Sequence, residues 1–255
     1  MTPTLCLVHL CWMPYGIDPP RRFLESYRAH EAGAPHRLLV VFAGARIEDR
    51  APWHRLFDAV EHERLDVGDG IDLDHYRAAV DRFAAERYCF LNTESVVLVD
   101  DWLGMMARAL AEPEVGLVGA TGSYESPNAV RPGPLRRLRP GHDPFPNPHL
   151  RTNAFALERE LILDLGWPTG LTKLQAVALE GGSRSITRQV QERGLQTLVV
   201  GRDGAYPPKR WREARTFRSG DQENLLVSDN RTRHYHECGR LARAGLAWLA
   251  WQALG

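Results

Sequence analysis

The chain has 255 residues, enough for one large α/β domain with a sizeable core. Acidic and basic residues balance at 32 each, so overall charge favours neither a nucleic-acid partner nor an acidic membrane. The four cysteines include no C-x-x-C pair, which argues against a zinc ribbon and favours reduced, structural cysteines. The apolar start at 4–12 lacks a basic leader and a cleavage site, so no secretion signal is expected.

The first 112 residues are predicted to alternate strands and helices. Continuous apolar runs indicate buried strands, and amphipathic or proline-initiated segments indicate helices. Strands alternating with helices favour a doubly wound, mainly parallel sheet with helices on both faces. The predicted strands are 5–8, 37–44, 63–67 and 88–91, and the predicted helices are 18–31, 53–60 and 72–87.

The second half is predicted to be less regular. A long loop rich in proline, glycine and arginine spans 127–148, and loops of this length are usually functional or disordered. Residues 203–233 are polar and are expected to be irregular. The remaining predicted elements are strands at 115–120, 151–155 and 195–200 and helices at 158–165 and 183–193.

The C-terminal run 241–254 is apolar and contains Trp248 and Trp251. It is too short to cross a bilayer. Two readings stay open: a helix packed on the domain, or an amphipathic helix that contacts a membrane surface.

Polar side chains follow the strand 88–91 directly. Asn92, Thr93, Glu94 and Ser95 stand where a parallel strand reaches its carboxyl edge, and ligands bind at that edge in open α/β sheets. Asn92 and Glu94 offer the oxygen ligands that Mg²⁺ prefers. Their alternative role is to cap the turn or helix that follows.

This segment resembles the GT-A glycosyltransferases, especially the large inverting family with many bacterial polysaccharide enzymes. Those enzymes read strand, D-x-D or N-x-D, a short apolar run and a Trp-Leu helix start; here Asn92 and Glu94 form a degenerate version of the motif, and Trp102-Leu103 follow. Weaker matches bring the coverage to about residues 4–202. They are 9–15, 115–119, 153–167 and 191–200.

The resemblance implies a GT-A-like, Rossmann-like fold: a mostly parallel central sheet, helices on both faces and a mixed acceptor-side half. It implies one catalytic domain over 1–239, with a nucleotide-binding half at about 1–112 and an acceptor half with a C-terminal lid at 113–239. The amphipathic helix 240–255 would follow this domain.

For the donor, the resemblance implies a nucleotide-sugar held between the first loop and the turn after the fourth strand. Arg184 and Arg188, four residues apart on a predicted helix, are candidates to meet its diphosphate or else form a solvated face. The candidate donor-binding residues are His9, Pro14, Tyr15, Asn92, Thr93, Glu94, Ser95, Arg184 and Arg188.

In the enzymes it resembles, carboxylates hold a divalent metal that bridges the diphosphate. Asn92 carries no charge, so Mg²⁺ or Mn²⁺ is expected to bind weakly or to be dispensable, with Glu94, Asn92 and His234 as ligands. His234 and His236 would share one face if they lay on a strand. The segment 215–236, dense in hydrogen-bonding groups, is predicted to be either a lid over the donor or an ordinary surface loop.

Inverting members carry a Glu-Asp pair before the closing helix, and its aspartate takes the acceptor proton. Counting back from Gly194 puts Gly182 and Ser183 at the positions of this pair, so Glu180 is the first candidate for the base. If Glu180 faces solvent, Asp221 and Glu223 are the next candidates. The alternative is that Glu180 is an exposed loop acid, and the enzyme is retaining and needs no such base.

For the acceptor, the candidate residues are Arg151, Thr152 and Asn153, which begin a strand with an unusually polar start. The alternative is that Arg151 pairs with a carboxylate and Asn153 fixes a turn.

The predicted function is glycosyl transfer from a nucleotide-sugar to a hydroxyl of a glycan or glycolipid, in bacterial surface polysaccharide or glycolipid synthesis. The protein is expected to be cytoplasmic, with peripheral contact to the inner membrane through 240–255. A non-catalytic sugar- or nucleotide-binding protein is one alternative. A nucleotidyltransferase is another, disfavoured because no Gly-rich basic phosphate loop follows the first strand.

Overall fold

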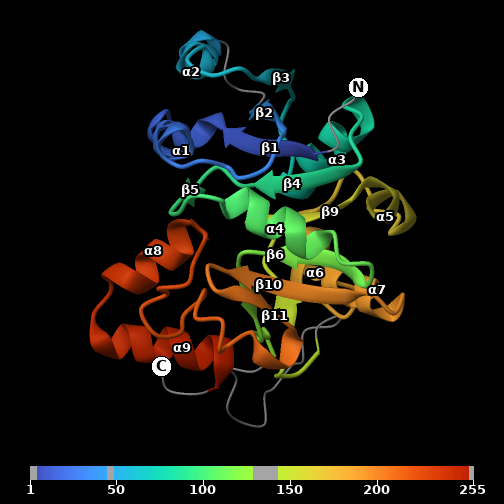
Figure 1. The fold of residues 1–255 in the computed structure, drawn as a ribbon, viewed down its shortest axis with the longest axis vertical. Helices are drawn as coiled ribbons and strands as arrows, with labels where there is room; N and C mark the ends of the chain where they lie inside the picture. The colour runs from blue at the N-terminus through green and yellow to red at the C-terminus, as the bar shows by residue number, and fades with distance from the viewer. Residues whose placement is uncertain (1–4, 45–48, 129–142, 253–255) are drawn as a thin grey trace.

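The computed structural model describes residues 5–44, 49–128 and 143–252. A central sheet of eight described strands runs through the molecule in the order β11-β10-β6-β9-β4-β1-β2-β3 (Figure 1). The strands are β1 (Leu5–Trp12), β2 (Arg37–Ala43), β3 (Glu63–Asp66), β4 (Arg87–Leu91), β6 (Val115–Gly119), β9 (Ala154–Glu158), β10 (Gln196–Gly201) and β11 (Gly204–Tyr206).

The sheet is mostly parallel. β1 pairs in parallel with β2 and β4, β2 with β3, and β6 with β10. Two strands run against this direction: β9, inserted between β4 and β6, and β11 at the edge. The predicted α/β fold is therefore confirmed, and β9 is what makes the second half mixed.

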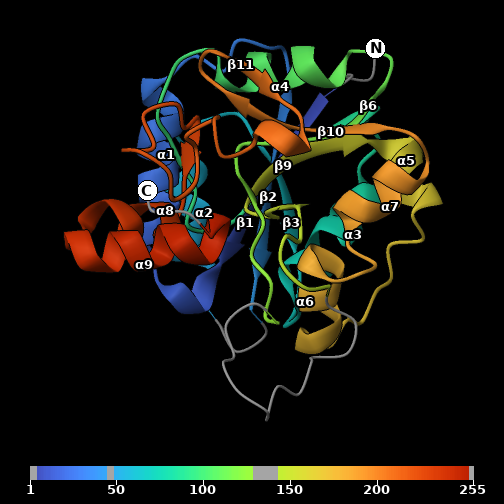
Figure 2. The same ribbon diagram turned by 90° about the horizontal axis from the view of Figure 1, so that it is seen from below.

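Helices cover both faces of the sheet, and Figure 2 shows α1 on one side and α3, α6 and α7 on the other. The inner strands are buried along most of their length, which explains why they have continuous apolar runs instead of alternating ones, whereas the edge strands β3 and β11 are more exposed. The α-helices are α1 (Asp18–Ala29), α2 (Ala51–Phe57), α3 (Asp72–Arg82), α4 (Trp102–Leu110), α5 (Arg159–Asp164), α6 (Lys173–Gly181), α7 (Ile186–Glu192), α8 (Asn230–Glu237) and α9 (Arg240–Trp251).

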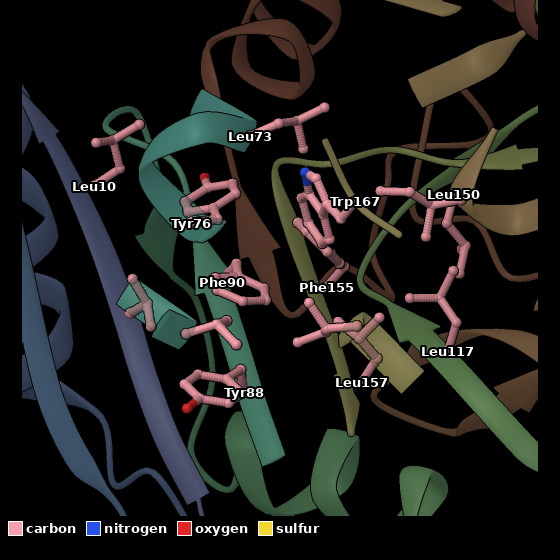
Figure 3. Close-up of a cluster of buried hydrophobic side chains, with 14 of the residues drawn as sticks. Leu10, Leu73, Tyr76, Tyr88, Phe90, Leu117, Leu150, Phe155, Leu157 and Trp167 are labelled. Carbon is pink, nitrogen blue, oxygen red and sulfur yellow. The ribbon is translucent and has the colours of Figure 1, made fainter. Parts of the chain in front are cut away.

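The core between the sheet and α3 combines aromatic rings with leucine side chains (Figure 3). Phe90 of β4 lies 4.7 Å from Tyr76 and 5.1 Å from Phe155 of β9, measured between ring centroids. Trp167 closes the cluster beside Phe155. Burying each such side chain contributes about 1.5–3 kcal/mol, so this cluster helps to hold β9 against β4.

The other core lies between the sheet and α1, and it contains His9. The imidazole is fully buried in β1 and stacks on Phe23 with ring centroids 3.7 Å apart. Neither ring nitrogen has a hydrogen-bond partner among the described residues. Burial lowers the pKa of His9 to about 3. The prediction that His9 contacts a donor is corrected: it is a neutral core residue.

The second half contains more regular structure than predicted. α6 was not predicted, and the segment 203–233, expected to be irregular, contains β11, the short strand β12 (Val227–Ser228) and most of α8. Its buried Trp211, Phe217 and Leu226 are spaced too irregularly to give a helical or strand period. Of the predicted long loop 127–148, residues 129–142 lie outside the described residues.

The C-terminal helix α9 packs on the domain through Ala247, Ala250 and Trp251, whose indole donates to the Phe217 carbonyl at 2.9 Å. Leu241 and Trp248 remain exposed. Within the described residues, no helix is both long enough and apolar enough to cross a membrane.

His9 generates a prediction about pH. Its pKa is lower in the folded chain than the ordinary 6.5, so protonation favours the unfolded state. Its contribution to stability is complete above pH 6.5 and is lost as pH falls towards 3, at about 1.4 kcal/mol per unit. His9→Leu should change stability at pH 7 by less than about 1.5 kcal/mol. The variant should also lose about 2 kcal/mol less stability than wild type when the pH falls from 7 to 5.

Urea unfolding at the two pH values measures this difference. The matched control is His234→Leu on the exposed side of α8, which should keep the wild-type dependence. Equal pH dependence in His9→Leu and wild type would contradict the buried, neutral imidazole.

Candidate functional site

The first loop and the turn after β4 meet at one edge of the sheet. Because β1 and β4 are parallel neighbours, with His9 opposite Leu91, both chains leave the sheet on the same side. The Trp12 backbone N–H donates to the Thr93 hydroxyl at 2.9 Å, which ties the two segments together. A cavity of about 320 Å³ opens here, called the Asn92 cavity. Its lining residues are Trp12, Tyr15, Gly70, Ile71, Asp72, Asn92, Thr93, Glu94, Lys173 and Asn230.

Local hydrogen bonds hold the turn at 92–95. The Asn92 side-chain oxygen accepts from the Ser95 hydroxyl at 2.9 Å, and the Asn92 backbone N–H donates to the Asn153 carbonyl at 2.9 Å. Ser95 is fully buried and Thr93 nearly so. Of the four predicted donor-binding residues in this turn, Asn92, Thr93 and Glu94 line the cavity, whereas Ser95 serves to shape the turn.

Glu94 is held by two arginines. Arg22 of α1 donates through Nη2 to Glu94 Oε2 at 3.0 Å, and Arg233 of α8 donates through Nη2 to the same oxygen. Arg233 also donates through Nη1 to the Glu94 carbonyl at 2.9 Å. Glu94 is therefore the meeting point of α1, α8 and the turn.

The residues predicted to hold a metal do not fit one. The Glu94 carboxylate is already neutralised by two guanidinium groups, and the Asn92 oxygen accepts from Ser95. His234 and His236 lie on α8 and not on a strand, so they do not share a face: residues two apart on a helix point in different directions. The described residues contain no group of three or more His, Cys, Asp and Glu side chains placed to hold a metal ion.

A second cavity, of about 350 Å³, lies around Glu180 and is called the Glu180 cavity. Glu180 sits in the last turn of α6 and accepts from the Thr152 hydroxyl at 3.0 Å and from the Thr152 backbone N–H at 3.3 Å. The cavity's lining residues are Glu125, Ser126, Pro127, His149, Arg151, Val177, Glu180, Gly181, Arg231 and Leu249. Glu180 and two of the predicted acceptor residues, Arg151 and Thr152, are thus brought together.

Arg151 also has a structural task. Its guanidinium forms a buried ion pair with Asp229 at 2.7 Å and lies over the Phe217 ring at 4.3 Å. Burial opposes ionisation of Asp229, but the Arg151 charge and the hydrogen bonds from Thr232 outweigh it and hold the pKa of Asp229 below its usual range. The pair joins the strand region of the Glu180 cavity to the start of α8.

Asn153 fixes a turn, as the alternative reading held. Its side-chain oxygen accepts from the Thr121 hydroxyl at 2.7 Å, and its carbonyl accepts from Asn92. The strand predicted at 151–155 in fact begins at Ala154, because residues 152 and 153 form a turn.

The structure places the other predicted residues away from both cavities. Arg184 precedes α7 instead of sharing its face with Arg188, and Arg188 pairs with Asp143 at 2.5 Å. Asp221 and Glu223 are exposed and pair with Arg243 and Arg215. These four positions are corrected to surface and structural roles. Pro14 is exposed in the first loop and does not line the Asn92 cavity.

Asp72 is a residue that the sequence reasoning missed. It begins α3, directly after the third parallel strand, and lines the Asn92 cavity. Its side chain reaches solvent from a recess, and the surrounding protein, followed by the negative charge of Glu180, raises its pKa to about 6. Its position after a parallel strand was the available signal, but a helix-starting aspartate is common enough to be read as a cap alone.

The buried ion pair generates a prediction on stability. Asp229→Ala leaves the Arg151 charge buried without a partner and removes the side-chain cap of α8, where Asp229 accepts from the Thr232 backbone N–H at 2.8 Å. We expect a loss of about 3–5 kcal/mol in urea unfolding. The control Asp221→Ala breaks an exposed pair and should change stability little. Similar losses of stability in the two variants would contradict the conclusion that the buried Arg151–Asp229 pair holds α8 in place.

Comparisons with known proteins find the same fold. No protein-family model matches the chain, and no curated protein matches its sequence. The mannosyltransferase PcManGT from Pyrobaculum calidifontis, solved with GDP-Man and Mn²⁺, matches with a TM-score of 0.53 and 13% identity over 84% of this chain. This chain spans 60% of the length of that protein.

Two further solved structures are similar at lower scores. One is 4-diphosphocytidyl-2C-methyl-D-erythritol synthase from Anaerococcus prevotii, with a TM-score of 0.49, 9% identity, and coverage of 76% of this chain and 87% of the other. The second is a part of TarS from S. aureus, with a TM-score of 0.41, 10% identity, and coverage of 64% and 49%. With the sheet order and the mannosyltransferase match, the chain has a GT-A-like fold.

Proposed function

We propose that this protein transfers a sugar from a nucleotide-sugar donor to a hydroxyl group of an acceptor. The observation that carries the proposal is the pair of adjoining cavities at the carboxyl edge of a GT-A-like sheet. Fold alone does not decide function, so the residues that line these cavities are what support glycosyl transfer.

The Asn92 cavity suits the donor. Tyr15, largely exposed, and the half-buried Trp12 offer aromatic surface for a base, and Lys173 offers a positive charge at the start of α6. The cavity lies where ligands bind in open α/β sheets, because three parallel strands deliver their loops to it.

The Glu180 cavity suits the acceptor. It combines Glu125, Glu180 and Arg231 with apolar Val177 and Leu249, a mixture that fits the hydroxyl groups and apolar faces of a sugar. The two cavities are neighbours: Asn230 lines one and Arg231 the other, and Asp72 in the first cavity is close enough to Glu180 in the second to feel its negative charge.

The proposed reaction forms one bond to the anomeric carbon and breaks another. The acceptor oxygen forms a bond to the anomeric carbon, the bond from that carbon to the diphosphate oxygen breaks, and its electron pair leaves with the diphosphate. Glu180 takes the acceptor proton. Holding donor and acceptor in neighbouring cavities supplies the positional part of the catalysis.

The proposed acceptor is a glycan or glycolipid at the inner membrane. In support, α9 exposes Leu241 and Trp248, and interfacial helices insert side chains of this kind into a membrane surface.

The donor cavity is tested by binding. We expect at least one of the UDP-, GDP-, CMP- or dTDP-sugars to raise the melting temperature, because a ligand present at 100 times its Kd adds about 2.7 kcal/mol of stability. Tyr15→Ala should weaken this binding about tenfold, since stacking on a base is worth about 1–3 kcal/mol. Trp248→Ala, an exposed aromatic outside both cavities, is the matched control. Stabilisation by none of the four donors would remove the proposed function.

The role of Glu180 is tested by Glu180→Gln, which keeps an oxygen to accept from Thr152 and removes basicity. If Glu180 is the base, single-turnover transfer should fall by about 10²–10⁴-fold while donor affinity stays unchanged. Glu112→Gln, at an exposed position outside both cavities, is the control and should retain most of the rate. Near-normal transfer by Glu180→Gln, with the donor's anomeric configuration kept in the product, would instead indicate a retaining enzyme without this base.

A further inference from the structure

Three separate elements bring charged groups to one point beside the Asn92 cavity. Glu94 comes from the turn after β4, Arg22 from α1 and Arg233 from α8. The Glu94 side chain is 17% exposed, whereas those of Arg22 and Arg233 are 44% and 27% exposed. The carboxylate is thus the inner member of the cluster, and the guanidinium groups stand closer to solvent.

The cluster carries one negative and two positive charges, so it has a net charge of +1. A divalent cation on Glu94 would stand next to two fixed positive charges, which repel it. The same excess attracts an anion. Because a guanidinium group presents a planar fork of donors that matches phosphate oxygens, the anion that this cluster fits best is a phosphate or diphosphate.

Hydrogen-bonding capacity remains for such a ligand. A guanidinium group has five N–H donors. Within the described part of the chain, Arg22 uses Nη2 for Glu94, and Arg233 uses Nη1 and Nη2 for the Glu94 carbonyl and carboxylate. Glu94 therefore holds part of each guanidinium group and leaves other N–H groups of Arg22 and Arg233 able to donate to phosphate oxygens.

We propose that Arg22 and Arg233 take the place of a divalent metal at the donor diphosphate, with Glu94 as the residue that positions both. The inference rests on the proposed function, since it assigns the diphosphate subsite of the same donor. When the bond from the anomeric carbon to the diphosphate breaks, the electron pair stays on the diphosphate oxygen, and the two guanidinium groups stabilise the added charge.

A purely structural clamp is the competing explanation. Arg233 alone would tie α8 to the turn through the Glu94 carbonyl, with no ligand involved. Arg22 separates the two explanations, because it lies on the exposed side of α1 and bonds only the carboxylate within the described part of the chain.

The experiment measures binding of UDP, GDP, dTDP and inorganic pyrophosphate by calorimetry, in EDTA and in Mn²⁺. Wild type should bind at least one of the diphosphates equally well in both. Arg22→Ala and Arg233→Ala should each weaken that binding at least tenfold in EDTA, and Arg233→Lys should weaken it less than Arg233→Ala. Arg21→Ala is the matched control: it neighbours Arg22, but its partner is Asp18 at 2.7 Å.

The double variant Arg22→Ala/Arg233→Ala frees Glu94 for a metal. Mn²⁺ should then restore part of the lost affinity, and adding Glu94→Gln should abolish that restoration. Wild-type binding that disappears in EDTA and returns with Mn²⁺ would overturn the inference while leaving the proposed function intact. Unchanged affinity in folded Arg22→Ala would also overturn it, and this variant decides the matter if Arg233→Ala does not fold. Binding of no diphosphate under either condition would overturn the proposed function and this inference with it.

Discussion

The whole site depends on the antiparallel insertion of β9 between β4 and β6. Because β4 runs parallel to β1 and antiparallel to β9, the end of β4 and the start of β9 lie at the same sheet edge. The Asn92 N–H donates to the Asn153 carbonyl across this point. A parallel strand in the place of β9 would have begun at the opposite edge, and Thr152 and Glu180 would not stand beside the turn at 92–95.

Charge pairing supplies the second layer of organisation. Two carboxylates, Glu94 and Asp229, each form an ion pair with an arginine. Both ion pairs join the C-terminal segment to the loops at the carboxyl edge of the central sheet. The Asp229 carboxylate also caps α8, whereas at Glu94 it is the backbone carbonyl that accepts a second hydrogen bond from Arg233. Asp229 is therefore costly to replace, because a single substitution leaves the Arg151 charge and the Thr232 backbone N–H without their partner.

The sequence predicted the sheet well because buried parallel strands leave a strong local signal. It also singled out Glu180 and Thr152, which hydrogen bond to each other, but it placed Glu180 in a loop, whereas Glu180 lies in the last turn of α6. His9 was misassigned for a physical reason: in a strand buried on both faces, alternation does not tell which polar side chain reaches a ligand. A polar residue in such a strand can be stacked and desolvated, as His9 is against Phe23.

The partners of Glu94 could not be predicted from the sequence, because they lie far from it along the chain. Glu94 is separated from Arg22 by 72 residues and from Arg233 by 139, and no local pattern marks either arginine among the many exposed ones. The sequence analysis singled out the segment 215–236 as rich in polar groups, but it chose Asp221 and Glu223 as the candidates. These two side chains form ion pairs with Arg243 and Arg215 on the outer surface. The residue that turns inward to Glu94 is Arg233, and only the docking of α8 reveals it.

This dependence on α8 distinguishes a guanidinium site from a metal site. A metal bound by Asn92 and Glu94 would be held by one turn, whatever the C-terminal segment does. Arg233 lies on α8, which is held in place where β12 pairs with β5 (Val96–Val97) and where Asp229 pairs with Arg151. The positive charge beside the Asn92 cavity thus comes with the docked C-terminal segment. If a diphosphate binds there as proposed, its binding and the docking of this segment are thermodynamically linked, because a ligand that binds only the docked form must stabilise it.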